Sequence, residues 1–269
     1  PELTYEEYLN FHRTYYHPSN SYIYLYGNMD MEEKLNWLDQ EYLSAYDKKE
    51  VDSEIHLQKP FEKMHDITKP YSIASNESTE DNTYLSYNKV IGTSLDEKLY
   101  LAFQILDYAL LSAPGAPITK ALLEAGIGKD ISGSYDSSTY QPIFSIVAKN
   151  ANEEQKAEFV KVIEDTLKGI VENGMDKKAL EAGINYHEFR YREADFGGYP
   201  KGLMYGLQIF DSWLYDETKP FIHVEALGTF AFLKEQISTG FRHTFWIISM
   251  EHWLRSCRNR DVQPDWMQN

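Results

Sequence analysis

The sequence predicts an α+β fold, in which helices pack on one face of an antiparallel sheet, preceded by a partial domain of the same kind. Two observations predict this fold. Pairs of short segments rich in β-favouring residues alternate with longer segments whose apolar residues recur at helical spacing. The chain also opens on a helix–strand–helix pattern that a charged stretch separates from the rest. Such an alternation is typical of a sheet covered by helices on one side.

The opening pattern starts with a helix whose N-terminus is capped by Thr4, with Glu7 reaching back to it. Pro18 ends this helix, because the residue before a proline disfavours helical geometry. Residues 21–26 predict a strand, and Asp30 predicts the start of a second helix over residues 31–44. The apolar face of that second helix needs a partner surface; its residues are Leu35, Leu38, Tyr42 and Leu43. We therefore expect residues 1–46 to be the C-terminal remnant of a preceding domain.

Residues 47–67 are rich in charge and poor in periodic apolar residues, which predicts a linker. The main domain is expected over residues 68–240, beginning with strands at 71–74 and 82–91. Ser94 and Glu97 then predict a capping box for a helix that runs to about residue 112.

The second half of the main domain repeats the pattern. A Pro-Gly turn at 113–117 leads into a short helix that ends at Gly126, a good left-handed C-terminal cap. Two strands and a series of helices follow. The strands are predicted over 129–135 and 143–149, and the helices over 152–173, 177–193, 200–215 and 224–236.

Composition excludes several classes of protein. The formal net charge is −16, and no basic stripe compensates for it, so nucleic-acid binding is not expected. No apolar run approaches the roughly 18 residues that a membrane span needs. The only cysteine is Cys257, which rules out an internal disulfide and favours a reducing, cytoplasmic location.

Residues 241–269 differ in composition from everything before them. They contain no lysine, three of the five tryptophans and the single cysteine. Two interpretations stay open: a helix that contacts a partner or a membrane surface, or an end of the chain that is not native.

Metal-ligand motifs are incomplete. His187 and Glu188 begin a pattern that would need histidine at Tyr191, and a phenol that titrates near 10 is a poor zinc ligand. Glu251 and His252 lack the histidine three residues before Glu251. The sequence therefore predicts no catalytic residue and no metal site, and it places His187 on a polar helix flank with ordinary ion pairs. An autonomous metalloenzyme that uses His187 is a remote alternative.

Five blocks, in order along the chain, carry a resemblance to a known family. They are residues 15–30, 88–96, 113–117, 125–131 and 188–197. Together they resemble the pitrilysin/insulinase-type zinc metallopeptidases, the inverzincins, and in particular the presequence-protease branch. The resemblance covers almost everything from residue 1 to residue 240.

The resemblance implies a clamshell of four homologous domains around a chamber in which unstructured peptides are cut. The zinc site would lie in the first domain, so this chain would hold no cofactor, although the full-length enzyme would bind zinc. Its partners would be peptide substrates and the remaining domains of the same protease. The alternative is a catalytically inactive scaffold or interaction subunit with the same fold.

One binding site follows from the same resemblance. In the insulin-degrading relatives, an exposed strand edge of the second domain captures a substrate end by strand addition. The corresponding residues here are Ile131, Ser132, Gly133 and Ser134. Their small side chains would let another backbone approach closely. The alternative reading is that Gly133 marks a β-bulge.

Overall fold

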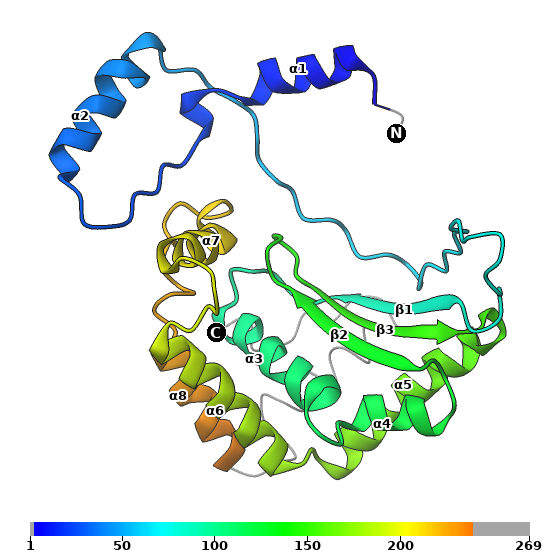
Figure 1. The fold of residues 1–269 in the computed structure, drawn as a ribbon. Helices are drawn as coiled ribbons and strands as arrows, with labels where there is room; N and C mark the ends of the chain where they lie inside the picture. Colours follow the sequence, from blue (N-terminus) through cyan, green and yellow to red (C-terminus); the bar gives the residue numbers. More distant parts are fainter. Residues whose placement is uncertain (1–2, 239–269) are drawn as a thin grey trace.

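A three-stranded antiparallel sheet, covered by helices on one face, forms the centre of the fold (Figure 1). The computed structural model describes residues 3–238. The strand order is β1 (Thr83–Val90), β3 (Ile143–Ala151), β2 (Asp130–Asp136). The helices on the covered face are α3 (Glu97–Asp107), α4 (Pro117–Glu124), α5 (Lys156–Asn173), α6 (Lys177–Glu193) and α8 (Leu227–Ser238). The predicted α+β fold class is confirmed.

The strands of the sheet follow from their alternating residues. In β1, Leu85 and Tyr87 are buried while their neighbours Ser86 and Asn88 are exposed. The strand predicted over residues 71–74 is wrong, because a strand needs a hydrogen-bonded neighbour and this segment has none among the described residues. Instead, the Tyr71 hydroxyl donates to Asn82, and its ring packs 5.7 Å from the ring of Tyr84 on β1.

The long helix α3 begins two residues later than predicted. Asp96 is its N-cap and accepts from the N–H groups of Lys98 and Leu99 at 3.1 and 2.9 Å. Ser94 is instead fully buried, with its Oγ lacking a hydrogen-bond partner within residues 3–238. After Asp107 the helix continues as a π-helical turn, Tyr108–Ser112, so the expected helical end near residue 112 is confirmed.

The predicted end of α4 is also confirmed. Gly126 has φ +68°, and its N–H bonds the carbonyl of Leu123, while Ile127 bonds Leu122. The remaining helices match their predicted ranges to within a few residues. They include α7 (Lys201–Trp213), and α5 follows a 3₁₀ turn (Glu153–Gln155) that Asn152 caps.

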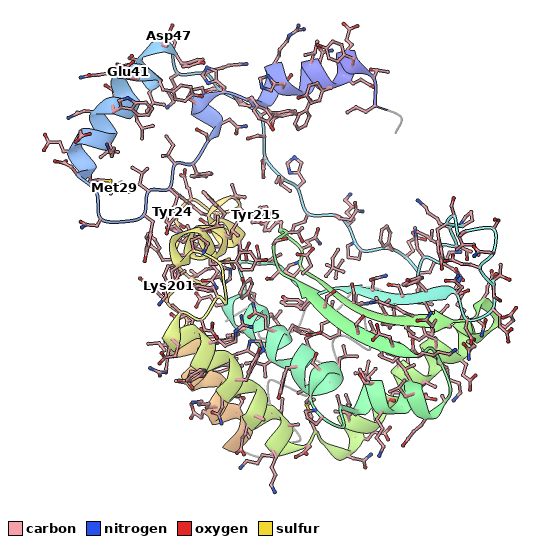
Figure 2. All side chains as sticks on the ribbon, in the orientation of Figure 1. Tyr24, Met29, Glu41, Asp47, Lys201 and Tyr215 are labelled. Atoms are coloured by element: carbon pink, nitrogen blue, oxygen red, sulfur yellow. The ribbon has the colours of Figure 1, made fainter. Side chains whose placement is uncertain are left out.

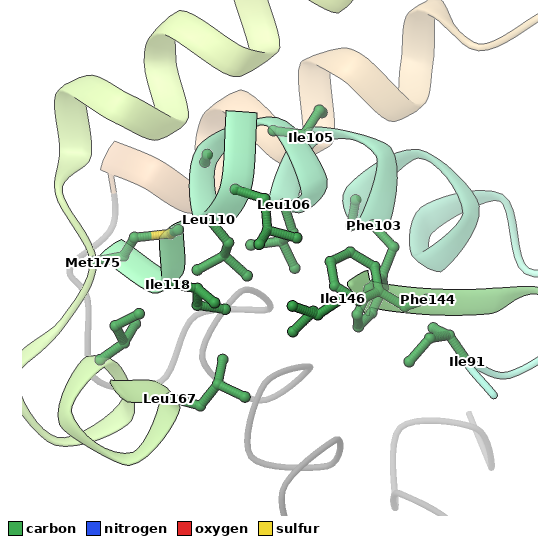
Figure 3. Close-up of a cluster of buried hydrophobic side chains, with 14 of the residues drawn as sticks. Ile91, Phe103, Ile105, Leu106, Leu110, Ile118, Phe144, Ile146, Leu167 and Met175 are labelled. Atoms are coloured by element: carbon green, nitrogen blue, oxygen red, sulfur yellow. The ribbon is translucent and has the colours of Figure 1, made fainter. Parts of the chain in front are cut away.

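The hydrophobic core lies between the sheet and its helices (Figure 3). Phe103 of α3 and Phe144 of β3 meet edge to face, with ring centroids 5.9 Å apart. Other fully buried members come from α3, α4, β3 and α5, and α6 and α8 contribute further ones; those from the first four elements include Ile105, Leu106, Ile118, Ile146 and Leu167. This core anchors both α3 and the centre of the sheet.

The N-terminal segment lies apart from the sheet. It contains α1 (Tyr5–Tyr15), whose capping box joins Thr4 and Glu7 as predicted, and α2 (Met31–Glu41), capped by Asp30. The apolar face of α2 is largely uncovered within the described chain, with Leu35 53% exposed. Residues 46–82 contain no helix or strand, in keeping with a linker, and the domain boundaries stay a prediction.

The strand predicted over residues 21–26 is wrong. No strand within residues 3–238 pairs with this segment, so it stays extended without a ladder. Its tyrosines pack on α7 instead: the Tyr22 ring lies 4.4 Å from Trp213, and Tyr24 lies over Gly206. Figure 2 shows Tyr24 of this segment above the start of α7 at Lys201.

Residues 241–269, for which the sequence leaves two interpretations open, lie outside the described residues. Among residues 3–238, no helix combines the length and the apolar character that crossing a bilayer requires.

Candidate functional site

The predicted peptide-binding residues form the middle of β2, which is an edge strand. Ile131, Ser132, Gly133 and Ser134 pair with β3 in a continuous register, from Asp130 opposite Lys149 to Asp136 opposite Ile143. The alternative of a β-bulge at Gly133 is therefore wrong. Within the described part of the chain, no strand pairs with the outer edge of β2.

The register fixes which backbone groups face that outer edge. The N–H of Ile91 donates to the carbonyl of Pro142 at 2.8 Å, so Pro142 and every second residue after it form their backbone hydrogen bonds with β1. The residues of β3 that lie between these form their backbone hydrogen bonds with β2. Ser145 is one of those between, and it lies opposite Ser134. The backbone N–H and C=O of Ser134 therefore form hydrogen bonds with β3, whereas those of Gly133 beside it point outward. The residues of β2 that face outward in this way are Ile131, Gly133 and Tyr135.

Gly133 itself is explained by helix packing. A Cβ at this position would lie 2.3 Å from Cδ1 of Leu111 and 2.5 Å from Oδ1 of Asp107. The close approach that the small residue permits is thus the approach of α3 and its π-helical turn to the sheet. Ser132 and Ser134, by contrast, alternate onto the opposite, open face of the sheet.

Asp107 lies beneath Gly133 at the C-terminal end of α3. Its Oδ1 is buried and has no hydrogen-bond partner within residues 3–238. Burial raises the pKa of this carboxyl to about 6. Asp107 is not among the residues predicted from the sequence, although a single acid after the apolar run of α3 is a signal that could have indicated it.

A cavity of about 210 Å³ lies away from β2, between α3, α6 and α7. Two imidazoles line it, His187 and His223. The His223 ring stacks on Tyr100 at 3.6 Å, and its Nε2 is buried without a partner among the described residues. Burial lowers the pKa of both histidines to about 4, so both rings are neutral at pH 7.

His187 does not lie on the polar helix flank that the sequence predicted. Its ring is not on an exposed polar flank, because it packs toward α3 and interacts with the backbone of Gln104. The expected ion pair at helical spacing is present: Glu188 accepts from Arg192 at 2.7 Å, and Lys234 also contacts it. Within residues 3–238, no three His, Cys, Asp or Glu side chains lie together as metal ligands would.

Asp211 of α7 lies beside the same region, next to Tyr100. The Tyr100 hydroxyl donates to its Oδ2 at 2.8 Å, and burial nevertheless raises the pKa of this carboxyl to about 6. Above pH 6 the folded protein therefore holds a buried charge that the unfolded chain would expose to water.

We expect the substitution Asp211→Asn to change how stability depends on pH. As pH falls from 7 to 5, the folded wild type takes up a proton on Asp211 while the unfolded chain, with an ordinary pKa of 3.8, does not. Wild type therefore gains about 1 kcal/mol of stability that the variant cannot gain. Urea unfolding of both proteins at pH 7 and pH 5 measures the difference. A constant difference between the two pH values would contradict the raised pKa.

Comparison with known proteins identifies the family. Residues 2–186 match the peptidase M16 inactive domain. The chain belongs to the peptidase M16 family. The suspected relationship to insulinase-type peptidases is confirmed, and the matched region is the non-catalytic domain.

Two relatives carry the same relationship along most of the chain. Protein HypA of Clostridium perfringens is 48% identical over 90% of this M16 chain. Presequence protease 1, chloroplastic/mitochondrial, of Arabidopsis thaliana is 36% identical over 80% of it. The chain spans 25% of the first protein and 20% of the second.

A solved structure supports the fold. The peptidase M16 inactive domain of Pseudomonas fluorescens superposes with a TM-score of 0.62, covering 98% of this chain and 59% of its own, at 16% identity. At that identity the likeness concerns the fold alone. It agrees with the helix-covered antiparallel sheet described above.

Proposed function

We propose that this M16 chain is the non-catalytic portion of a zinc metalloendopeptidase that degrades unstructured peptides in a closed chamber. Its part is to shape the chamber and to hold a peptide along β2. Residues 1–46 would be the remnant of the catalytic domain, 47–67 the linker and 68–240 the second domain. The zinc ligands would lie in the catalytic domain, because no suitable set of side chains exists in the described residues.

The outer edge of β2 is the observation that supports peptide binding. An extended peptide can add to an edge strand when that strand offers outward N–H and C=O groups. Ile131 and Gly133 offer such groups at alternate positions, with the spacing that an added strand needs. The adjoining open face carries small polar side chains, among them Ser132 and Ser134, which leave room for a second backbone.

The N-terminal segment supports the proposed division into domains. The apolar face of α2 is exposed, and Trp37 on the same helix is 59% exposed. An exposed apolar surface of this kind is typical of an interface with another part of the protein. A cytoplasmic location belongs to the same proposal and rests on the single cysteine of the sequence.

Peptide capture is tested with a backbone substitution that leaves the side chains unchanged. Replacing Ile131 by its α-hydroxy analogue converts its amide to an ester and removes one outward N–H. We expect the affinity for a fluorescently labelled, unstructured 20-residue peptide to fall about 2- to 13-fold, the worth of one net hydrogen bond. Fluorescence anisotropy measures the affinity, and the same samples should show no peptide hydrolysis.

The matched control is the same ester at Ser132, whose N–H bonds β3. It should lower stability and leave peptide affinity nearly unchanged. Equal affinities for wild type and the Ile131 ester would reject strand addition at this edge. The reading frame before Pro1 provides a separate check, since the peptidase proposal requires His-x-x-Glu-His there and a scaffold subunit does not.

A further inference from the structure

On the outer edge of β2, Gly133 brings no side chain between the strand backbone and α3. Ile131, Gly133 and Tyr135 alternate onto the face that the helices cover, and the two larger side chains flank the glycine. Leu111 and Asp107 fill the place that a side chain of residue 133 would take, with atoms 2.3 and 2.5 Å from where its Cβ would stand. A carboxylate therefore lies directly against the backbone of the edge strand.

The charge of that carboxylate is not compensated by the described part of the chain. None of the ion pairs formed within residues 3–238 involves Asp107, and its Oδ1 has no hydrogen-bond donor. A buried acceptor without a partner is costly, and native structures rarely keep one without a reason. With a pKa of about 6, the group is mostly ionised at pH 7.5. A cation that reached Oδ1 would remove this cost.

Strand addition brings a side chain to this place. Residues directly opposite each other on paired strands point to the same face of the sheet, with Cβ atoms about 4.5–5.5 Å apart. The peptide residue opposite Gly133 would therefore point toward α3 and Asp107. A side chain at residue 133 would stand between that peptide residue and Asp107, and glycine places none there.

We propose that Asp107 is a specificity-determining residue that binds a cationic group of the captured peptide at the position opposite Gly133. The cation is an ammonium or guanidinium, carried by a lysine or arginine side chain or by the free N-terminus. The proposal rests on the proposed capture of peptides along β2.

The experiment compares three unstructured 12-residue peptides by fluorescence anisotropy at pH 7.5. One is acetylated and amidated with a single central lysine, one has norleucine in its place, and one is the norleucine peptide with a free N-terminus. Wild type should bind at least one of the two cationic peptides about 10-fold more tightly than the neutral one. Which of them is preferred distinguishes the side chain from the terminus. Asp107→Asn should abolish the preference.

Asp136→Asn is the matched control, because it also removes one carboxylate charge, but from β2 itself and on the open, exposed face. It should keep the preference of the wild type. A preference that survives in Asp107→Asn, or equal binding of all three peptides by wild type, overturns the role of Asp107 while leaving peptide capture intact. Failure of all three peptides to bind overturns both proposals.

Discussion

Phe144→Ala is expected to destabilise the chain by about 3–5 kcal/mol, the usual cost of removing a fully buried phenylalanine. Phe144 is the second residue of the middle strand, β3, and has no exposed surface. It contacts Phe103 of α3 and lies opposite Tyr135 of β2 in the register. The cavity would therefore lie where the sheet meets its covering helix. Urea denaturation followed by circular dichroism measures the loss.

The neighbouring residue of the same strand gives the control. Ile143 points to the open face and is 37% exposed, so Ile143→Ala should cost much less, about 1 kcal/mol. Similar losses for the two variants would mean that the helices do not cover the face that contains Phe144.

Gly133→Val should destabilise the fold by about 1–3 kcal/mol, the range for overpacking. The new side chain would collide with Leu111 and Asp107, whose atoms stand 2.3 and 2.5 Å from the added Cβ. The ends of these two side chains can shift in part, and this relief keeps the expected loss of stability within that range. A valine otherwise suits a strand, so propensity favours the variant and only packing opposes it.

Ser134→Val tests this reasoning at the next residue. Ser134 is exposed on the open face, where valine meets no helix, and the variant should be as stable as wild type or slightly more stable. If both valine variants were equally tolerated, the close approach of α3 to β2 would be wrong. The loss of stability also means that a change in peptide binding by Gly133→Val does not report on the edge alone.

Local signals predicted most of the main domain. The end of α4 followed from Gly126, whose positive φ any other residue would adopt at a cost. The alternation of Leu85 and Tyr87 with polar neighbours predicted both β1 and its buried face. The capping residues Thr4 and Asp30 predicted the two N-terminal helices, because a cap acts within one turn of its own position.

The misses share a cause. Residues 71–74 and 21–26 have the composition of strands, but a strand exists only if another strand lies beside it. Ser94 and Asp96 are both suitable N-caps, and the packing that buries Ser94 leaves Asp96 to cap α3. His187 follows the same pattern, since the sequence places it on a helix but does not tell which face of α6 meets α3.

The family, the α+β class and the order of the elements follow from the sequence alone: five blocks of residues resemble the family, and local periodicity, caps and turns give the class and the order. The three-dimensional structure was needed to show that β2 is an edge strand and which of its backbone groups point outward. It also placed Asp107 under Gly133, although the two residues are distant in the sequence. The physical reason is that strand order and helix packing arise from long-range burial, which no local pattern encodes.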